Sequence, residues 1–152
     1  MPAQRFLLFP GLVLAVVLFA GCNTFERRAQ EKSTAFSTLT PAQREQLEHG
    51  SISIGDTPDM VYIALGEPDE KRETTSAHGH ETIWIYNQYQ RDPAFPIGGA
   101  YRRDLVFDPI ARRYALIYAP LPLDALDDEV AEEYIRVTFH DGKVAVIEQP
   151  KA

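Results

Sequence analysis

The chain has 152 residues, enough for one globular domain with extensions, and its 45% hydrophobic and 24% charged residues are typical of a folded soluble domain. Its 22 acidic and 15 basic residues give a formal net charge of −7, which argues against a non-specific nucleic-acid binder, because that mode of binding needs a basic surface. We therefore expect no nucleic-acid partner. The single cysteine, Cys22, excludes an internal disulfide framework.

The N-terminal segment has the pattern of a secretory signal. Arg5 ends a short basic stretch, residues 6–20 are uncharged and almost wholly apolar, and two small residues precede Cys22. The apolar run of about 15 residues is shorter than the roughly 20 that a spanning helix needs, and Pro10-Gly11 interrupts it. Cleavage is therefore expected rather than permanent insertion.

Residues 18–22, Leu-Phe-Ala-Gly-Cys, resemble the bacterial lipobox, in which the cysteine thiol is acylated and the chain is cut just before it. Phe19 stands where the lipobox usually has leucine. The resemblance implies that residues 1–21 are a lipoprotein signal peptide and that Cys22 carries several acyl chains, which anchor it stably to a membrane. Asn23 is not the aspartate that resembles an inner-membrane retention signal, which favours the outer membrane. An ordinary signal peptide with an incidental cysteine and an uncleaved anchor helix are the alternatives.

Residues 22–40 form the predicted tether. They are polar, rich in serine, threonine and charge, and show no sustained hydrophobic period, so we expect a flexible lipidated N-terminus that holds the domain off the bilayer. The globular domain is expected over residues 41–149.

The first helix of the domain is predicted for residues 41–49. Thr40 is a good N-cap, Pro41 occupies the first helical position and Gln43 the capping-box position, and Gly50 ends the helix. Its apolar content is poor, so we expect it to lie on the surface against the second helix.

The second helix, inside residues 54–68, organises the rest of the fold. Thr57 is its N-cap, Pro58 its first residue, and Gly66 is expected in the left-handed conformation after its end, with Pro68 preventing continuation. A helix of about two turns is not stable alone in water. We therefore expect its apolar residues to pack on a sheet.

Strands are predicted downstream for residues 71–75, a weak edge strand, and for residues 82–89, 101–107, 114–118, 134–139 and 143–148. Residues 101–118 form a hairpin around Asp108-Pro109, the two prolines of residues 119–123 end that hairpin, and residues 91–99 are a loop. In the fifth strand Ile135, Val137 and Phe139 are expected inward and Arg136, Thr138 and His140 outward. Asp141-Gly142 signals a type I′ turn. The predicted class is α+β, with two short N-terminal helices on one face of an antiparallel β-meander and an extra hairpin insertion.

The order of these parts resembles the BamE (SmpA/OmlA) family of outer-membrane lipoproteins. After the lipobox, the residues that carry the resemblance, and for which it implies structural roles, are Gly55, Val61, Leu65, Gly66, Pro68, Trp84, Tyr86, Phe139 and Gly142. The inserted residues 103–133 are longer than the family's compact three-stranded sheet. The resemblance implies a periplasm-facing accessory lipoprotein that binds protein partners in outer-membrane β-barrel assembly and envelope integrity.

Catalytic and metal sites are not expected. His78 and His80 flank Gly79 without further ligands nearby, which is typical of a solvated hairpin tip rather than a zinc site. No Gly-x-Ser-x-Gly motif is present, and the acid-rich residues 124–133, which include Asp127 and Asp128, are typical of a solvated helix or loop. We predict a non-enzymatic protein without cofactor.

A partner-binding patch is predicted from aromatic and basic residues, the composition enriched at protein interfaces: Tyr86, Tyr89, Arg91, Arg102 and Arg103. Trp84 is expected in the core. The alternative function is an envelope binding or inhibitory module for peptidoglycan, lipid headgroups or a periplasmic enzyme, which calls for an apolar groove lined by Trp84 and Tyr86. A periplasmic hydrolase is a third hypothesis and requires a deep cleft with converging acids or a Ser-His pair. The sequence does not specify the oligomeric state.

Overall fold

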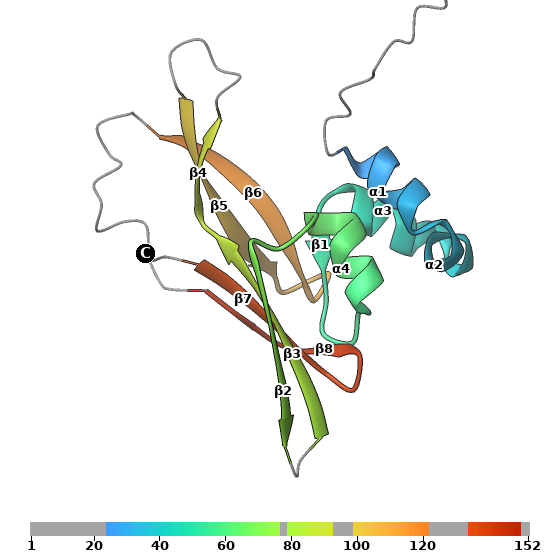
Figure 1. Cartoon of the computed structure of the whole chain (residues 1–152). Coiled ribbons are helices and arrows are strands. Elements are labelled where there is room, and N and C mark those ends of the chain that lie inside the picture. The colour runs from blue at the N-terminus through green and yellow to red at the C-terminus, as the bar shows by residue number, and fades with distance from the viewer. Residues whose placement is uncertain (1–23, 77–78, 93–98, 122–133, 150–152) are drawn as a thin grey trace, which may run out of the picture.

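The computed structural model describes residues 24–76, 79–92, 99–121 and 134–149 (Figure 1). The helices of these residues are α1 (Phe25–Glu31), α2 (Ser33–Thr38), α3 (Pro41–Glu48) and α4 (Pro58–Leu65). The strands are β1 (Ser51–Ile52), β2 (Glu70–Ser76), β3 (Gly79–Asn87), β4 (Tyr89–Asp92), β5 (Gly99–Asp108), β6 (Arg113–Leu121), β7 (Tyr134–His140) and β8 (Lys143–Glu148). The predicted α+β class is confirmed.

The strands form two antiparallel sheets, not one meander. The first has the order β1-β6-β5-β4, three full strands extended by the two-residue β1, and the second has the order β2-β3-β7-β8. The single-meander prediction is wrong because β2 and β7 occupy both edges of β3. The chain must therefore leave that sheet at Gln88, and β4, β5 and β6 build the other sheet before β7 returns. The predicted hairpin insertion is the centre of this first sheet.

Helix α4 is the centre of the core, as its sequence predicts. The Thr57 side chain accepts a hydrogen bond from the Met60 N–H, and Pro58 opens the helix. Gly66 ends it with φ 89° and ψ −166°, so its φ is positive as expected, but its ψ is extended rather than left-handed helical. The buried residues of α4 are Met60, Val61, Ile63, Ala64 and Leu65.

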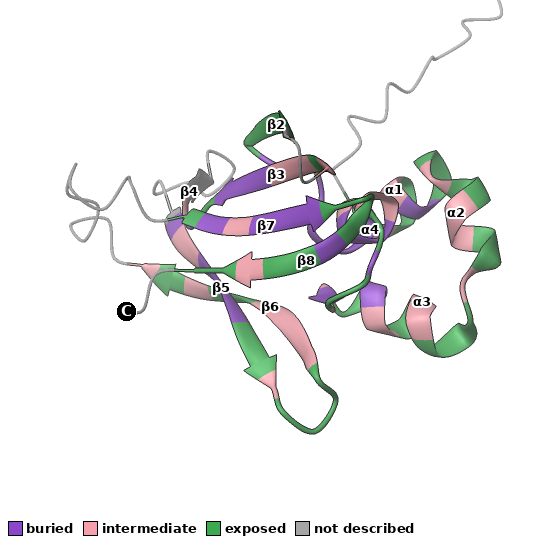
Figure 2. Cartoon of the chain, turned by 90° about the horizontal axis from the view of Figure 1, so that it is seen from below, coloured by how far each residue is buried: buried purple, intermediate pink, exposed green. Residues whose placement is uncertain are grey.

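One face of the second sheet completes this core. Trp84 and Tyr86 of β3 pair with Val137 and Ile135 of β7, so the four side chains share a face. They belong to the same buried cluster as the α4 residues, and the rings of Trp84 and Phe139 make an edge contact at 4.9 Å between centroids. Figure 2 shows the buried residues gathered along α4, β3 and β7. The prediction that Trp84 lies in the core is confirmed.

The tether prediction is wrong for residues 25–38, which fold into α1 and α2. Thr24 caps α1, and Ala29 is buried in the core cluster with Phe25 and Phe36 packed against it. Arg28 donates from Nε to the Ile63 carbonyl at 2.8 Å and from Nη2 to the next carbonyl of α4 at 3.2 Å. These contacts pin α1 to α4, so the folded unit begins before residue 41.

The strand predictions hold with local corrections. Helix α3 has the expected capping box between Thr40 and Gln43. Strand β6 continues past Pro120, although the prolines were predicted to end it. The Leu116 N–H donates to the Gly50 carbonyl, on the side of β6 away from β5, and alternation puts position 120 on that same side. Pro120, which has no N–H, therefore removes no hydrogen bond to β5. The predicted loop 91–99 is shorter at both ends, because residues 91 and 92 belong to β4 and residue 99 begins β5.

In the last hairpin, the expected turn is confirmed, with φ of 48° at Asp141 and 73° at Gly142. Thr138, predicted to point outward, is only 7% exposed, because it lies between Ile83 and Val146 of the neighbouring strands. The acid-rich residues 124–133 lie outside the described residues.

Candidate partner-binding site at the junction of the sheets

The five residues of the predicted patch do not form one surface. Tyr86 is only 2% exposed and Arg103 only 7%, whereas Tyr89 and Arg102 are partly exposed. Arg91 lies in β4, and its side chain is outside the described part of the chain. The patch therefore divides into an internal pair and a surface pair.

The internal pair joins the two sheets. Arg103 donates from Nε to the Asn87 carbonyl at 3.0 Å and from Nη2 to Asp69 Oδ2 at 2.9 Å, and its guanidinium lies 5.8 Å from the Tyr86 ring centre. The Tyr86 hydroxyl donates to the Gly66 carbonyl at 3.2 Å. Burial raises the pKa of Tyr86, so it stays protonated. Both residues hold the fold and leave little surface for a partner.

A second polar group lies beside this pair, where the chain crosses between sheets. Buried Gln88 donates from Nε2 to the Arg103 carbonyl at 3.3 Å and to Asp104 Oδ1 at 3.0 Å, while its Oε1 has no hydrogen-bond partner within the described part of the chain. Arg102 donates from Nε to Asp104 Oδ2 at 2.9 Å, and its hydrogen bonds to Asp104 and to Tyr89 raise its pKa. The guanidinium of Arg102 is thus held in a fixed position at the edge of the surface.

The surface pair continues into an apolar strip on the first sheet. Tyr89 pairs with Arg102 across β4 and β5, and alternation along β5 places Val106 on the same face. Ile117 of β6 joins that face because it pairs opposite Asp104. Val106 is 49% exposed and Ile117 46%. We call the surface of Tyr89, Arg102, Val106 and Ile117 the Tyr89 face.

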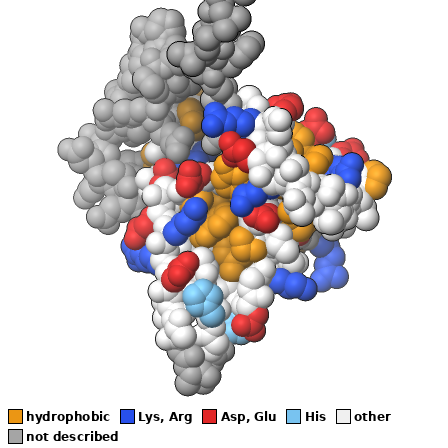
Figure 3. Space-filling view, turned by 45° about the vertical axis from the view of Figure 1, so that its right-hand side comes forward, with side chains coloured by type: hydrophobic (Ala, Val, Ile, Leu, Met, Phe, Trp, Pro, Cys, Tyr) orange, Lys and Arg blue, Asp and Glu red, His pale blue; other side chains and the backbone are white. Residues whose placement is uncertain are grey.

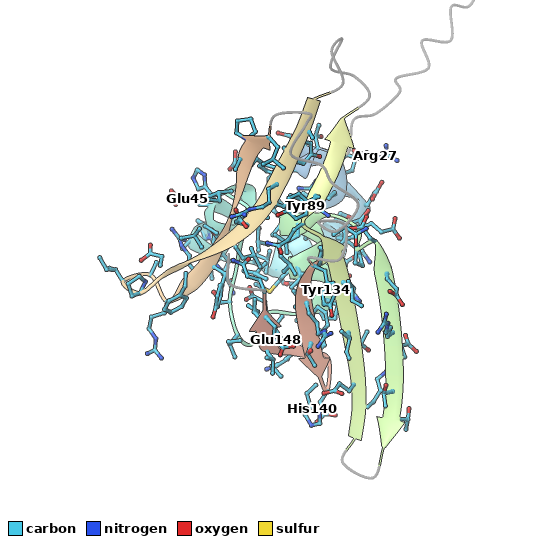
Figure 4. All side chains as sticks on the ribbon, turned by 90° about the vertical axis from the view of Figure 1, so that its left-hand side faces the viewer. Arg27, Glu45, Tyr89, Tyr134, His140 and Glu148 are labelled. Atoms are coloured by element: carbon cyan, nitrogen blue, oxygen red, sulfur yellow. The ribbon has the colours of Figure 1, made fainter. Side chains whose placement is uncertain are left out.

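Figure 4 shows Tyr89 on the first sheet, with Tyr134, His140 and Glu148 on the second. On the second sheet, Tyr134 lies under the Arg136 guanidinium at 5.3 Å, and Arg136 pairs with Glu148 at 3.4 Å. Tyr134 thus has a cation beside its ring, although it is still 37% exposed. Within the described residues, the second sheet has the same kinds of side chain on the face of Tyr134, Arg136 and Val146, and the Tyr89 face differs in having two exposed aliphatic side chains, Val106 and Ile117.

The residues behind the family resemblance occupy structural positions. Val61 and Phe139 are fully buried, Leu65, Trp84 and Tyr86 are in the same core cluster, and Pro68 is buried next to it. The glycines Gly55, Gly66 and Gly142 all have positive φ. Because Trp84 and Tyr86 point into this core, they do not line the exposed apolar groove that the alternative function called for. Cys22 lies outside the described residues.

The histidines give no support to a metal site within the described residues. His80 is exposed, and its Nδ1 lies 3.3 Å from Thr75 Oγ1 and its Nε2 3.4 Å from Thr82 Oγ1. His78 lies outside the described residues. In the described ranges, no three His, Cys, Asp or Glu side chains gather as a cation would require.

Figure 3 shows charged side chains of both signs intermixed around apolar ones, between the helices and the β2–β3 hairpin.

Sequence reasoning missed a groove of about 490 Å³ among α1, α2 and α3. Its lining is Phe25, Glu26, Ala29, Gln30, Ser33, Phe36, Ser37 and Arg44. The signal was present in Thr24, a good N-cap, and in the spacing of Phe25 and Ala29 four residues apart on one helix face. Among the helices described, none has the length and apolarity of a membrane span.

Comparisons of the chain with known proteins found no matching family model, no matching curated protein and no matching solved structure.

Proposed function

We propose that the chain is a non-enzymatic outer-membrane lipoprotein, anchored through acyl chains on Cys22, that acts as an accessory or scaffold factor in β-barrel protein assembly. It faces the periplasm, needs no cofactor and works by binding protein partners. The role is that of the BamE family, to which the sequence is similar.

The observation that carries the proposal is the meeting of the resemblance residues in one structural unit. The helix that ends at Gly66 packs on the face of Trp84 and Phe139, and the Tyr86 hydroxyl binds the carbonyl of Gly66 itself. Resemblance residues from distant parts of the chain thus contact one another in one core, as the proposed family role requires of them.

The Tyr89 face is the partner surface of this proposal. Arginine and aromatic residues are enriched among the hot spots of protein interfaces, and an arginine already held by a carboxylate loses little entropy when a partner binds it. Val106 and Ile117 add exposed aliphatic area beside Arg102. The partner expected here has an apolar surface with acceptor groups at its edge.

The test is affinity purification of the full chain through a C-terminal tag after mild membrane solubilisation. The proposal predicts that components of the β-barrel assembly machinery are recovered. It also predicts that the double substitution Val106→Glu and Ile117→Glu lowers the recovery roughly tenfold or more, because it places charges in an apolar contact.

Val146→Glu is the matched control, because Val146 is 45% exposed but lies on the other sheet. It should leave the recovery unchanged. Recovery of no assembly component with the unmodified chain counts against the proposed role. Equal loss with Val106→Glu, Ile117→Glu and Val146→Glu counts against the Tyr89 face.

A further inference from the structure

The groove among α1, α2 and α3 is an apolar surface that the Tyr89 face does not use. The rings of Phe25 and Phe36 meet edge to face in its wall, with centroids 5.9 Å apart, and the Arg44 guanidinium lies 5.0 Å from the Phe36 ring centre. Its volume of about 490 Å³ is within the range of pockets that hold small molecules. It is therefore large enough for a ligand and not merely a packing defect.

Two polar side chains of the lining, Ser37 and Arg44, already donate to carbonyls of α2. Ser37 Oγ donates to the Thr34 carbonyl at 2.8 Å, and Arg44 Nη2 donates to the Ser37 carbonyl at 3.0 Å. A peptide strand would have to satisfy its own backbone donors and acceptors along a wall whose exposed surface is mainly apolar. A hydrocarbon chain makes no such demand, so it suits this lining better.

The Arg44 guanidinium is already engaged in the wall of the groove. Its Nη2 donates to the Ser37 carbonyl and it lies over the Phe36 ring, while its Nε, which has no hydrogen-bond partner among the described residues, is covered by protein atoms. Arg44 therefore contributes a covered guanidinium to the wall and no free donor that would select a polar ligand.

The position of the groove in the chain indicates where such a hydrocarbon chain comes from. Phe25 and Glu26 line the groove, and the described chain begins at Thr24, the N-cap of α1. Cys22 is only two residues earlier, and two residues span at most about 7 Å. Any acyl group on Cys22 is thus attached within about 7 Å of Thr24 along the chain, so its effective concentration near the groove is high.

We propose that the groove formed by Phe25, Ala29, Phe36 and Arg44 binds one of the acyl chains attached to Cys22. This inference rests on the proposed lipid anchor. The remaining acyl chains stay in the bilayer, because more than one chain gives stable anchoring. The bound chain then fixes α1 and α2 at the membrane surface, and so sets which way the two sheets face.

The experiment uses the full chain, made in Gram-negative cells fed a palmitate analogue that carries a photoactivatable diazirine. After irradiation and digestion, mass spectrometry locates the analogue on Cys22 and maps its cross-links. The inference predicts cross-links within residues 25–44 of the same chain.

Ser33→Phe fills the groove from α2, and Thr34→Phe is the matched control, because Thr34 is the next residue of α2 and does not line the groove. Ser33→Phe should lower the groove cross-links roughly tenfold, because displacing about two methylene groups from an apolar site costs about that factor. Thr34→Phe should leave them unchanged. Gln30→Phe, which fills the groove from α1, provides an independent variant should Ser33→Phe fail to fold.

The outcomes separate this inference from the lipid anchor. Analogue on Cys22 with cross-links only to bilayer lipids, to a second copy or to another protein overturns the groove proposal and leaves the anchor intact. Cross-links in residues 25–44 that neither Ser33→Phe nor Gln30→Phe reduces also overturn it. Absence of the analogue from Cys22 overturns the lipid anchor and this inference together.

Discussion

Arg28 provides the sharpest test of the N-terminal helices, because its side chain completes the end of α4. The last carbonyls of a helix lack partners within the helix. In α4 the Gly66 N–H donates to the Tyr62 carbonyl, and the Arg28 guanidinium donates to the Ile63 and Ala64 carbonyls at 2.8 and 3.2 Å. Replacing Arg28 with methionine keeps the apolar stem and removes both bonds.

The expected cost follows from this geometry. Each hydrogen bond contributes about 1 kcal/mol net, and more when one partner is charged. A cation at a helix C-terminus contributes about 0.3–1 kcal/mol beyond that. Burial lowers the pKa of Arg28, so part of this gain offsets the desolvation of its charge. We therefore expect Arg28→Met to lower the free energy of unfolding by about 2–4 kcal/mol.

The assay is urea denaturation of residues 23–152, followed by the fluorescence of Trp84, the one tryptophan of the chain. Arg27→Met is the matched control: Arg27 is the neighbouring residue of α1, and its exposed ion pair with Glu31 is worth well under 1 kcal/mol. If the free energies of unfolding of Arg28→Met and Arg27→Met differ by less than about 0.5 kcal/mol, the bonds from Arg28 do not stabilise the packing of α1 on α4.

Three further predictions concern the core and the junction of the sheets. Gly66→Ala should lower the free energy of unfolding by about 1–3 kcal/mol, because a φ of 89° with an extended ψ is open almost only to glycine; an unchanged urea midpoint would refute this backbone strain. Arg103→Met should cost about 2–3 kcal/mol in the same assay, since it removes the side-chain donor of the Asn87 carbonyl and the ion pair with Asp69, which keeps its hydrogen bond from the Asn87 N–H. Arg102→Met should cost less and mainly weaken partner recovery; the reverse order would contradict the division into internal and surface pairs. Burial raises the pKa of Asp56 in the folded protein above its pKa in the unfolded chain. The stability that protonated Asp56 contributes is therefore fully present below its unfolded pKa and is lost as the pH rises through its folded pKa. The stability of Asp56→Asn relative to the unmodified chain should therefore increase across that window in urea titrations at several pH values, and a constant difference would exclude the raised pKa.

Local signals account for the parts of the fold that the sequence predicts well. Thr40 with Gln43, and Thr57 with Pro58, are start signals whose partners lie within the same helix turn, so they require no tertiary information. The same is true of Asp141-Gly142, whose two positive φ values define the turn. These elements form where the chain alone dictates.

Non-local contacts account for the rest. Helices α1 and α2 have fewer than eight residues each. Arg28 holds α1 through hydrogen bonds to carbonyls 35 and 36 residues away, and a local sequence pattern does not predict such contacts. Likewise, β7 pairs with β3 although β4, β5 and β6 lie between them in the sequence. That pairing decides whether the strands form one meander or two sheets. Sequence periodicity does not specify which strands become neighbours.

The candidate site was predictable in part. Aromatic and basic composition predicts Tyr89 and Arg102 at a partner surface, and both are partly exposed. The same composition predicts Arg103 there, although strand alternation places it on the face of Leu105, which is buried. That period of two was the available signal that separates the internal arginine from the exposed one.

The most direct measurement of the central claim is metabolic acyl labelling of the full chain and of Cys22→Ala, with fractionation of the membranes. A lipid-anchored protein predicts label on the unmodified chain in the outer-membrane fraction. It predicts no label on Cys22→Ala, which should become soluble or remain as the uncleaved precursor. Unchanged size and an unchanged membrane fraction for Cys22→Ala would contradict the anchor on which the proposed function depends.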